Sequence, residues 1–191
     1  MKGIKGTETE KNLLKSFAGE SQARNRYDLF AKQAKKEGFQ QIAEIFEQTA
    51  LHEHQHARRM FDFLEGGGVE ITAMYPAGKV GTTLENLRAA AAGENEEWTD
   101  LYPEFARVAR EEGFELVAKL YETICIAERH HDERYTELAK MVEANAVFYR
   151  QEKITWACRK CGYVFDGADA PKACPVCAHP QGHFEKRRYD W

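Results

Sequence analysis

The sequence predicts an all-α bundle of four helices with one long crossover, followed by a small C-terminal domain that binds a metal. Three observations lead to this prediction. The N-terminal part of the chain is an internal duplication, each copy has apolar residues at helical spacing, and four cysteines lie near the C-terminus. We place the bundle in residues 1–148 and the C-terminal domain in residues 153–191.

The internal repeat is visible in short identical segments. The segment EGF occurs at 37–39 and again at 112–114, an offset of 75, whereas AGE occurs at 18–20 and 92–94, an offset of 74. One residue has therefore been inserted in the second copy between Glu94 and Tyr102. An extra residue inside a helix is usually absorbed as a π-bulge, so we expect one there.

Each copy predicts a pair of helices. Core-facing positions recur at steps of three and four over residues 13–34, 42–63, 87–109 and 117–138. Gly38 and Gly113 mark the short turn inside each pair. Between the pairs, residues 66–83 have the glycine and proline content of a loop and are long enough to cross a bundle from end to end. Four helices with one long crossover predict a ferritin-like bundle.

Six potential metal ligands fall on the stripes that should face the core. A lone Glu at such a position is more often at the surface, and a lone His is more often a hydrogen-bonded core residue. Chance does not explain six such residues placed symmetrically in both copies of a duplication. In addition, buried carboxylates need a partner that neutralises their charge. One Glu from each of two helices and Glu-x-x-His from each of the other two form the pattern of a di-metal carboxylate site. The six residues are Glu20, Glu53, His56, Glu94, Glu128 and His131. Iron is favoured for redox chemistry, although manganese and zinc also fit these ligands.

Four further residues stand out near these ligands. Tyr27 and Tyr102 lie about two turns beyond a Glu on the same face, where a phenol can hydrogen-bond a ligating carboxylate or serve only as a core aromatic. Glu97 aligns with an alanine in the first copy, so the inserted region also adds a carboxylate that we expect to face the metals. Cys125, which aligns with Ala50, is predicted to be an inert core side chain.

The C-terminal segment carries a second metal motif. Cys158-x-x-Cys161 and Cys174-x-x-Cys177 enclose twelve residues and form a strong four-thiolate signature. A segment this short could hardly stay folded without its metal. The spacing does not separate an iron site from a structural zinc ribbon.

Composition argues against several other classes of function. Lys plus Arg number 27 against 31 for Asp plus Glu, without a block of like charges, so we expect neither nucleic acid nor an anionic membrane as a partner. The N-terminus lacks the apolar region of a signal peptide and the chain has no run of 18 apolar residues, so we expect a cytoplasmic protein.

The two motif sets together resemble a known family. CRKCGY and CPVC, with Trp156, Tyr163, Phe165 and Phe184 to cover the site, resemble rubredoxin, whose single iron carries electrons, although the spacer between the loops is shorter than in free rubredoxin. Joined to the duplicated bundle, the whole chain resembles the rubrerythrin family over essentially all 191 residues.

This resemblance implies a non-haem di-iron peroxidase that reduces hydrogen peroxide to water and protects an anaerobe from oxidative stress. It implies a homodimer in which the mononuclear iron of one subunit serves the di-iron site of the other. Electrons would come from NAD(P)H through a separate reductase, or from rubredoxin. A ferroxidase and a non-catalytic module with two structural metals are the alternatives. The implied oxo- and carboxylate-bridged irons would be held by Glu20, Glu53, His56, Glu94, Glu97, Glu128 and His131, the single iron by the four cysteines, and catalysis would involve Glu97, His56, Tyr27 and Tyr102.

Overall fold

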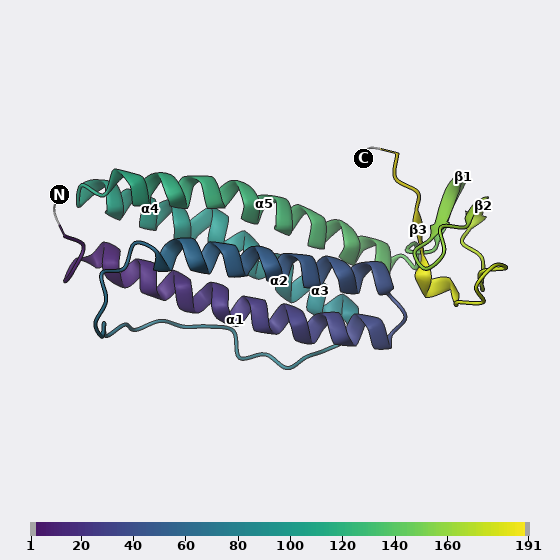
Figure 1. The fold of residues 1–191 in the computed structure, drawn as a ribbon, viewed down its shortest axis with the longest axis horizontal. Coiled ribbons are helices and arrows are strands. Elements are labelled where there is room, and N and C mark those ends of the chain that lie inside the picture. The colour runs from purple at the N-terminus through teal and green to yellow at the C-terminus, as the bar shows by residue number, and fades with distance from the viewer. Residues whose placement is uncertain (1–2, 190–191) are drawn as a thin grey trace.

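The computed structural model describes residues 3–189, which form a long helical bundle with a small β-sheet at one end (Figure 1). Within this range the bundle has four helical rods and one long crossover, so the predicted ferritin-like fold with a small C-terminal domain is confirmed. The third rod contains three consecutive elements. The rods are α1 (Glu8–Lys36), α2 (Gln40–Phe61), the series α3 (Thr83–Glu96), η1 (Glu97–Leu101) and α4 (Tyr102–Glu111), and α5 (Glu115–Glu143).

Local sequence signals fix the ends of these helices. The side chain of Thr7 caps the N-terminus of α1, and Thr82 and Glu85 form a capping box at the start of α3. The turns after α1 and α4 pass through Gly38 and Gly113, both with φ of +88°. Glycine adopts this left-handed conformation without steric cost, so the two copies of the repeat turn in the same way.

The crossover between α2 and α3 runs along the outside of α1 for most of the bundle's length (Figure 1). It begins directly after Phe61 and ends at Thr82, so it starts earlier than the predicted loop of residues 66–83. The Tyr75 hydroxyl donates a 2.6 Å hydrogen bond to the Lys15 carbonyl oxygen of α1. The crossover therefore covers one face of the bundle.

The third rod contains the expected π-bulge. Residues Glu97–Leu101 form the π-helix η1, and the Tyr102 N–H donates to the Glu97 carbonyl oxygen five residues back. Asp132 of α5 accepts hydrogen bonds from Trp98 Nε1 at 3.0 Å and from Asn95 Nδ2 at 2.9 Å. The wide turn is thus fastened to the neighbouring helix on both sides of Glu97.

The bundle core is divided into two apolar clusters. One contains Leu13 and Tyr121 near the N-terminal end of α1, and the other contains Phe46 and Tyr135 near the opposite end. Between the two clusters lies a layer of buried carboxylates and imidazoles. Helix packing on both sides of this layer holds its side chains in place.

The C-terminal segment forms a three-stranded antiparallel sheet in the order β2-β1-β3. Its central strand β1 (Tyr149–Cys158) is flanked by β2 (Val164–Asp169) and β3 (Phe184–Lys186), with the short 3-10 helix η2 (Gln181–His183) before β3. Strand β1 begins within a few residues of the end of α5, before residue 153.

This sheet packs against the turn between α1 and α2. The rings of Phe39 and Phe148 stack with centroids 6.0 Å apart, and Arg159 forms an ion pair with Glu44 of α2. A Cβ atom on Gly182 would lie 2.1 Å from the Gly38 carbonyl oxygen, so only glycine allows this approach. The tail is thereby seated on one end of the bundle.

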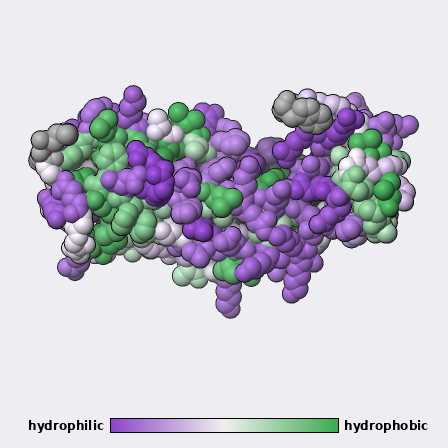
Figure 2. Space-filling view, viewed as in Figure 1, coloured by the Kyte–Doolittle hydropathy of each residue, from purple (hydrophilic) through white to green (hydrophobic). Residues whose placement is uncertain are grey.

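The exposed face is mostly hydrophilic, as Figure 2 shows for one side of the molecule. Apolar residues on that face gather near the N-terminal end of the bundle and in the sheet. In residues 3–189, no helix combines the length and apolar content needed to cross a membrane.

Candidate metal centres

Four helices deliver the predicted ligands to the polar layer of the bundle. The ligand atoms form two groups of four residues, and within each group they all lie within 4.8 Å of one another. Both groups share the two Glu residues of the Glu-x-x-His motifs. One group consists of Glu20, Glu53, His56 and Glu128, and the other consists of Glu53, Glu94, Glu128 and His131.

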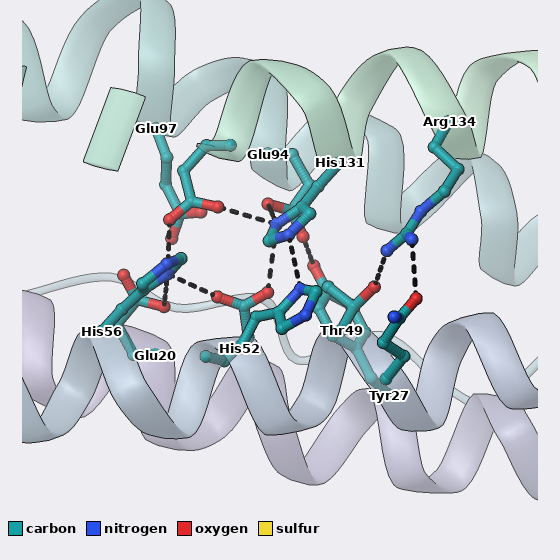
Figure 3. Close-up of polar contacts among 12 residues, drawn as sticks. Glu20, Tyr27, Thr49, His52, His56, Glu94, Glu97, His131 and Arg134 are labelled. Carbon is teal, nitrogen blue, oxygen red and sulfur yellow. Dashed lines mark hydrogen bonds and ion pairs between the residues drawn. The ribbon is translucent and has the colours of Figure 1, made fainter. Parts of the chain in front are cut away.

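Each imidazole in this layer faces several carboxylates (Figure 3). His56 Nδ1 lies 2.8 Å from Glu128 Oε1 and 3.1 Å from Glu53 Oε2. His131 Nδ1 lies 2.8 Å from Glu128 Oε2 and 3.3 Å from Glu94 Oε2. Glu128 therefore lies between the two imidazoles, as a bridging carboxylate would.

Burial and mutual charge shift the pKa values of these groups. Burial raises the pKa of Glu53 well above its ordinary value, and the neighbouring Glu128 and Glu94 carboxylates raise it further. Burial would also raise the pKa of Glu128, but contacts with His131 and His56 lower it to about 2. Burial would lower the pKa of His131, but contacts with Glu128 and Glu94 raise it to about 9. Metal ions bound by these residues would balance the carboxylate charge and displace protons from the cluster.

The carboxylate oxygens of this cluster are suited to bind metal. Glu20 Oε2 and Glu53 Oε1 are buried without a hydrogen-bond partner among residues 3–189, and the two buried oxygens of Glu128 face the imidazoles of His56 and His131. Buried carboxylates need charged partners or metals. Oxygen and imidazole ligands in two overlapping groups suit two first-row metal ions, so the residues fit a di-iron centre.

The two tyrosines support this layer from opposite sides. The Tyr27 hydroxyl donates to Glu94, and the Tyr102 hydroxyl donates to Glu20 Oε1 at 2.5 Å. Both phenols hydrogen-bond a carboxylate, as expected, but each carboxylate comes from the other copy of the repeat. These hydrogen bonds fix the orientation of two potential ligands.

Glu97 lies at the edge of the cluster and belongs to neither group of four. Its Oε1 atom is 3.4 Å from the Tyr102 hydroxyl, and Figure 3 shows the side chain extending from the π-helix toward Glu20 and His56. Burial raises the pKa of Glu97 well above its ordinary value, and the charge on Glu20 raises it further. The half-buried side chain thus extends toward the centre.

Two supporting residues were not identified as functional from the sequence. His52 Nδ1 lies 3.0 Å from His131 Nε2, the imidazole nitrogen that faces away from the carboxylates. Asp132 holds the π-helix through Trp98. The only signal in the sequence was their position next to a ligand, which by itself predicts another helix face.

The four tail cysteines meet between β1 and the loop before η2. Their sulfur atoms all lie within 4.8 Å of one another, with Cys158 to Cys177 at 3.7 Å and Cys161 to Cys174 at 3.6 Å. Thiolates arranged tetrahedrally at a metal–sulfur distance of about 2.3 Å would be about 3.8 Å apart. The arrangement fits one metal ion held by four thiolates.

Two family profiles match the two parts of the chain. The rubrerythrin profile matches residues 11–139, and the profile of the rubrerythrin rubredoxin-like domain matches residues 156–185. The chain belongs to the rubrerythrin family. As a member of that family, it carries a di-iron site in the bundle and a four-cysteine iron site in the tail.

Similar proteins cover the whole chain. The rubrerythrin of Porphyromonas gingivalis is 58% identical over 190 residues, which are 100% of this chain and 95% of that one. The rubrerythrin of Nitratidesulfovibrio vulgaris is 52% identical over 191 residues and covers 100% of both chains. The structure of fully reduced, all-ferrous nigerythrin matches with a TM-score of 0.63 and 30% identity, over 97% of this chain and 92% of that one. The chain is thus a member of a di-iron oxidoreductase family implicated in oxidative stress.

Proposed function

We propose that the protein reduces hydrogen peroxide to water at the bundle centre and receives the electrons through the tail iron. The observation that carries this proposal is that one chain holds both a cluster for two metals and a separate four-thiolate site. When bound, two irons supply together the two electrons needed to cleave the O–O bond, and an iron held by sulfur suits the one-electron return.

In this proposal the cluster residues have distinct roles. Glu53 and Glu128 belong to both groups and would be shared by the two irons, while Glu20 and His56 would hold one iron and Glu94 and His131 the other. These six residues, together with Glu97, carry five carboxylates, whose negative charge balances two iron ions. Tyr27 and Tyr102 hold Glu94 and Glu20 in place.

We further propose that Glu97 and His56 serve the same iron in different oxidation states. Both face Glu20: His56 Nδ1 lies 3.7 Å from Glu20 Oε2, and Glu97 reaches Tyr102, which donates to Glu20. An anionic carboxylate favours ferric iron, and a neutral imidazole favours ferrous iron. Crystal structures of the two redox states test this exchange, and Glu97 turned to solvent in both would contradict it.

The positions of the two centres support a homodimer. The tail lies beyond the C-terminal end of α5 (Figure 1), and His131 is 12 residues before that end, which corresponds to about 18 Å along the helix. The four cysteines lie farther still from the bundle centre of the same chain. We therefore propose that the tail of one subunit serves the bundle of a second subunit in the cytoplasm.

The external electron donor would approach the tail. Cys161 is the exposed member of the four cysteines, so the iron it holds lies near the surface. A rubredoxin or an NAD(P)H-dependent reductase that docks there could deliver one electron at a time.

Anaerobic stopped-flow spectroscopy of the fully reduced protein tests the peroxidase proposal. Mixing with hydrogen peroxide should oxidise the bundle irons faster than mixing with an equal concentration of oxygen. Faster oxidation by oxygen would overturn the proposal.

A cysteine variant separates the peroxidase from a ferroxidase. In Cys174→Ser, the bundle should keep its irons and react with peroxide once, but NAD(P)H-linked turnover should be lost. A ferroxidase that oxidises free ferrous iron needs no external donor, so an unchanged steady-state rate in this variant would favour that alternative.

A further inference from the structure

A partly enclosed cavity of about 360 Å³ lies between α1, the π-helix region and the crossover. Its outer side is closed by the crossover segment 72–76, which the hydrogen bond from Tyr75 to Lys15 holds against α1. Gly19 of α1 and Gly93 of α3 both line the cavity. Because neither has a side chain, the two helices leave space between them.

The inner end of this cavity is the di-iron cluster. Glu97, Tyr27 and Tyr102 line the cavity, and the two phenols donate directly to Glu94 and Glu20. A molecule in the cavity would therefore meet Glu97 and the two phenols, with Glu94 and Glu20 directly behind them. The cavity is an approach to the centre from the Glu97 side.

The cavity is much larger than hydrogen peroxide requires. A water molecule occupies about 30 Å³ in the liquid, and an apolar cavity of about 150 Å³ in another protein holds benzene. Hydrogen peroxide has only two heavy atoms. A volume of about 360 Å³ instead suits a compact organic molecule with one ring or a branched alkyl group.

The walls have the chemistry of a site for such a molecule. Ala23, Leu101 and Phe105 supply apolar surface from both helical rods, and the Tyr75 ring covers them from the crossover. Arg26 also lines the cavity, and its Nε atom is buried without a hydrogen-bond partner among residues 3–189. The Arg26 guanidinium thus adds a cationic hydrogen-bond donor to the residues around the cavity.

We propose that this cavity binds organic hydroperoxides with a compact apolar group, and that the protein reduces them to alcohols. This inference rests on the peroxidase function proposed above and names a further substrate class for the same centre. The reaction is ROOH + 2 e⁻ + 2 H⁺ → ROH + H₂O: the O–O bond breaks, two O–H bonds form, and the reduced iron pair supplies both electrons. The O–O group faces Glu97 and Tyr102, and the apolar group lies against Phe105 and Tyr75.

The first test measures binding without turnover. The full-length protein is loaded with zinc, which is redox-inactive and suits the same ligands, and is titrated with 2-phenyl-2-propanol, the alcohol formed from cumene hydroperoxide. We expect NMR contacts from the alcohol to the Phe105 ring and the Leu101 methyl groups. Absence of these contacts at millimolar alcohol would overturn the proposal, whatever the variants below show.

A cavity-filling variant tests the location. A Cβ atom on Gly19 would lie 3.5 Å from the Tyr75 ring, an ordinary contact, so the Leu side chain of Gly19→Leu should occupy the cavity. Asn25→Leu adds an apolar side chain to the exposed side of the same helix and serves as the matched control. Gly19→Leu should abolish the NMR contacts, whereas Asn25→Leu should retain them.

The second test compares substrates in the iron-loaded protein. Wild type should be oxidised by cumene hydroperoxide within about tenfold of its rate with hydrogen peroxide, and Gly19→Leu should lower the ratio of the two rate constants by at least about tenfold. Reaction with hydrogen peroxide alone would overturn this inference and leave the proposed function intact. Reaction with neither oxidant would overturn the proposed function. An unchanged ratio in Gly19→Leu would overturn the assignment to this cavity.

Discussion

The two copies of the repeat share a plan but differ in one helix. In the first copy, α1 is a single α-helix of 29 residues. In the second copy, the corresponding rod is interrupted by the π-helix at residues 97–101. Tyr27 follows Glu20 by seven positions and Tyr102 follows Glu94 by eight, yet both phenols reach a carboxylate of the centre. One inserted residue thus accompanies the extra carboxylate Glu97, and Tyr102 still reaches the centre.

Two residues that have no counterpart in the other copy support the second half of the site. At an offset of 75, Asp132 aligns with Ala57 and His52 aligns with Ala127. Asp132 of the second copy holds the π-helix through Trp98, and His52 of the first copy contacts His131 of the second. A nearly symmetric frame therefore holds an asymmetric centre.

Removing a carboxylate that both ligand groups share should abolish iron binding by both groups. In Glu53→Gln or Glu128→Gln, we expect loss of both bundle irons and retention of the four-cysteine iron, because these residues belong to both ligand groups. Metal analysis with the visible absorbance of the thiolate-bound iron measures this. The matched control is Glu122→Gln on the exposed face of α5, which should keep its full iron content. Two bundle irons in Glu53→Gln would contradict the assignment of a shared ligand.

Deleting the inserted residue should make the two copies alike. Deletion of Thr99, an exposed residue of the π-helix, should restore a regular α-helix and turn Glu97 away from the centre. We expect both irons to remain, with peroxide turnover about 10- to 100-fold lower, or roughly 1.4 to 2.7 kcal/mol in the barrier.

Two substitutions separate the effect of the chain length from the effect of the Glu97 carboxylate. Thr99→Ala keeps the chain length and should behave as wild type, whereas Glu97→Ala should reproduce the loss of turnover caused by the deletion. Wild-type turnover in the deletion variant would mean that the π-helix has no catalytic importance.

The variants Tyr27→Phe and Tyr102→Phe test the same difference between the two copies of the repeat. Each substitution leaves a buried carboxylate without its phenol donor, which should lower the free energy of unfolding by about 1.5 to 3 kcal/mol. Urea unfolding measures this loss, and we expect it to be similar for the two variants. Turnover should fall more in Tyr102→Phe, since Tyr102 also contacts Glu97. A larger fall in Tyr27→Phe would argue against a special role for the second copy.

Cys125 should show the smallest effect, because it differs from its counterpart Ala50 without touching the centre. Burial raises the pKa of Cys125 to about 11, so about one molecule in a thousand carries the thiolate at pH 8. Iodoacetamide should react slowly at pH 8 and faster as the pH approaches 11. Cys125→Ala should leave iron content and turnover unchanged, and rapid labelling at pH 8 would contradict the assignment of an inert thiol.

Sequence periodicity predicted the elements that depend on local spacing. Stripes at steps of three and four placed Glu20, Glu53, Glu94 and Glu128 inside the bundle, and the offset of 74 against 75 placed the π-helix between Glu94 and Tyr102. Paired CxxC motifs brought the four sulfurs together, since so short a segment has few ways to arrange them. These features are fixed by residues that are close in the chain.

The sequence pattern did not predict the contacts between side chains of different helices. The pairing of Tyr27 with Glu94 depends on how α1 packs against α3, and a single sequence does not report helix rotation and translation. The contact between His52 and His131 joins α2 to α5 for the same reason. The course of the crossover over α1, and hence the cavity beneath Tyr75, depends on packing that glycine and proline content does not specify.

The crossed tyrosine pairs have a consequence for folding. The first copy supplies the donor for Glu94 of the second copy, and the second copy supplies the donor for Glu20 of the first. Neither helical hairpin can complete its own polar layer, so neither is a self-sufficient folding unit. The two helix pairs, joined by the crossover, each complete the polar layer of the other. Unfolding should therefore be cooperative over the whole bundle. This is the arrangement expected if the duplicated chain descends from a shorter one whose two identical copies once completed each other as separate molecules.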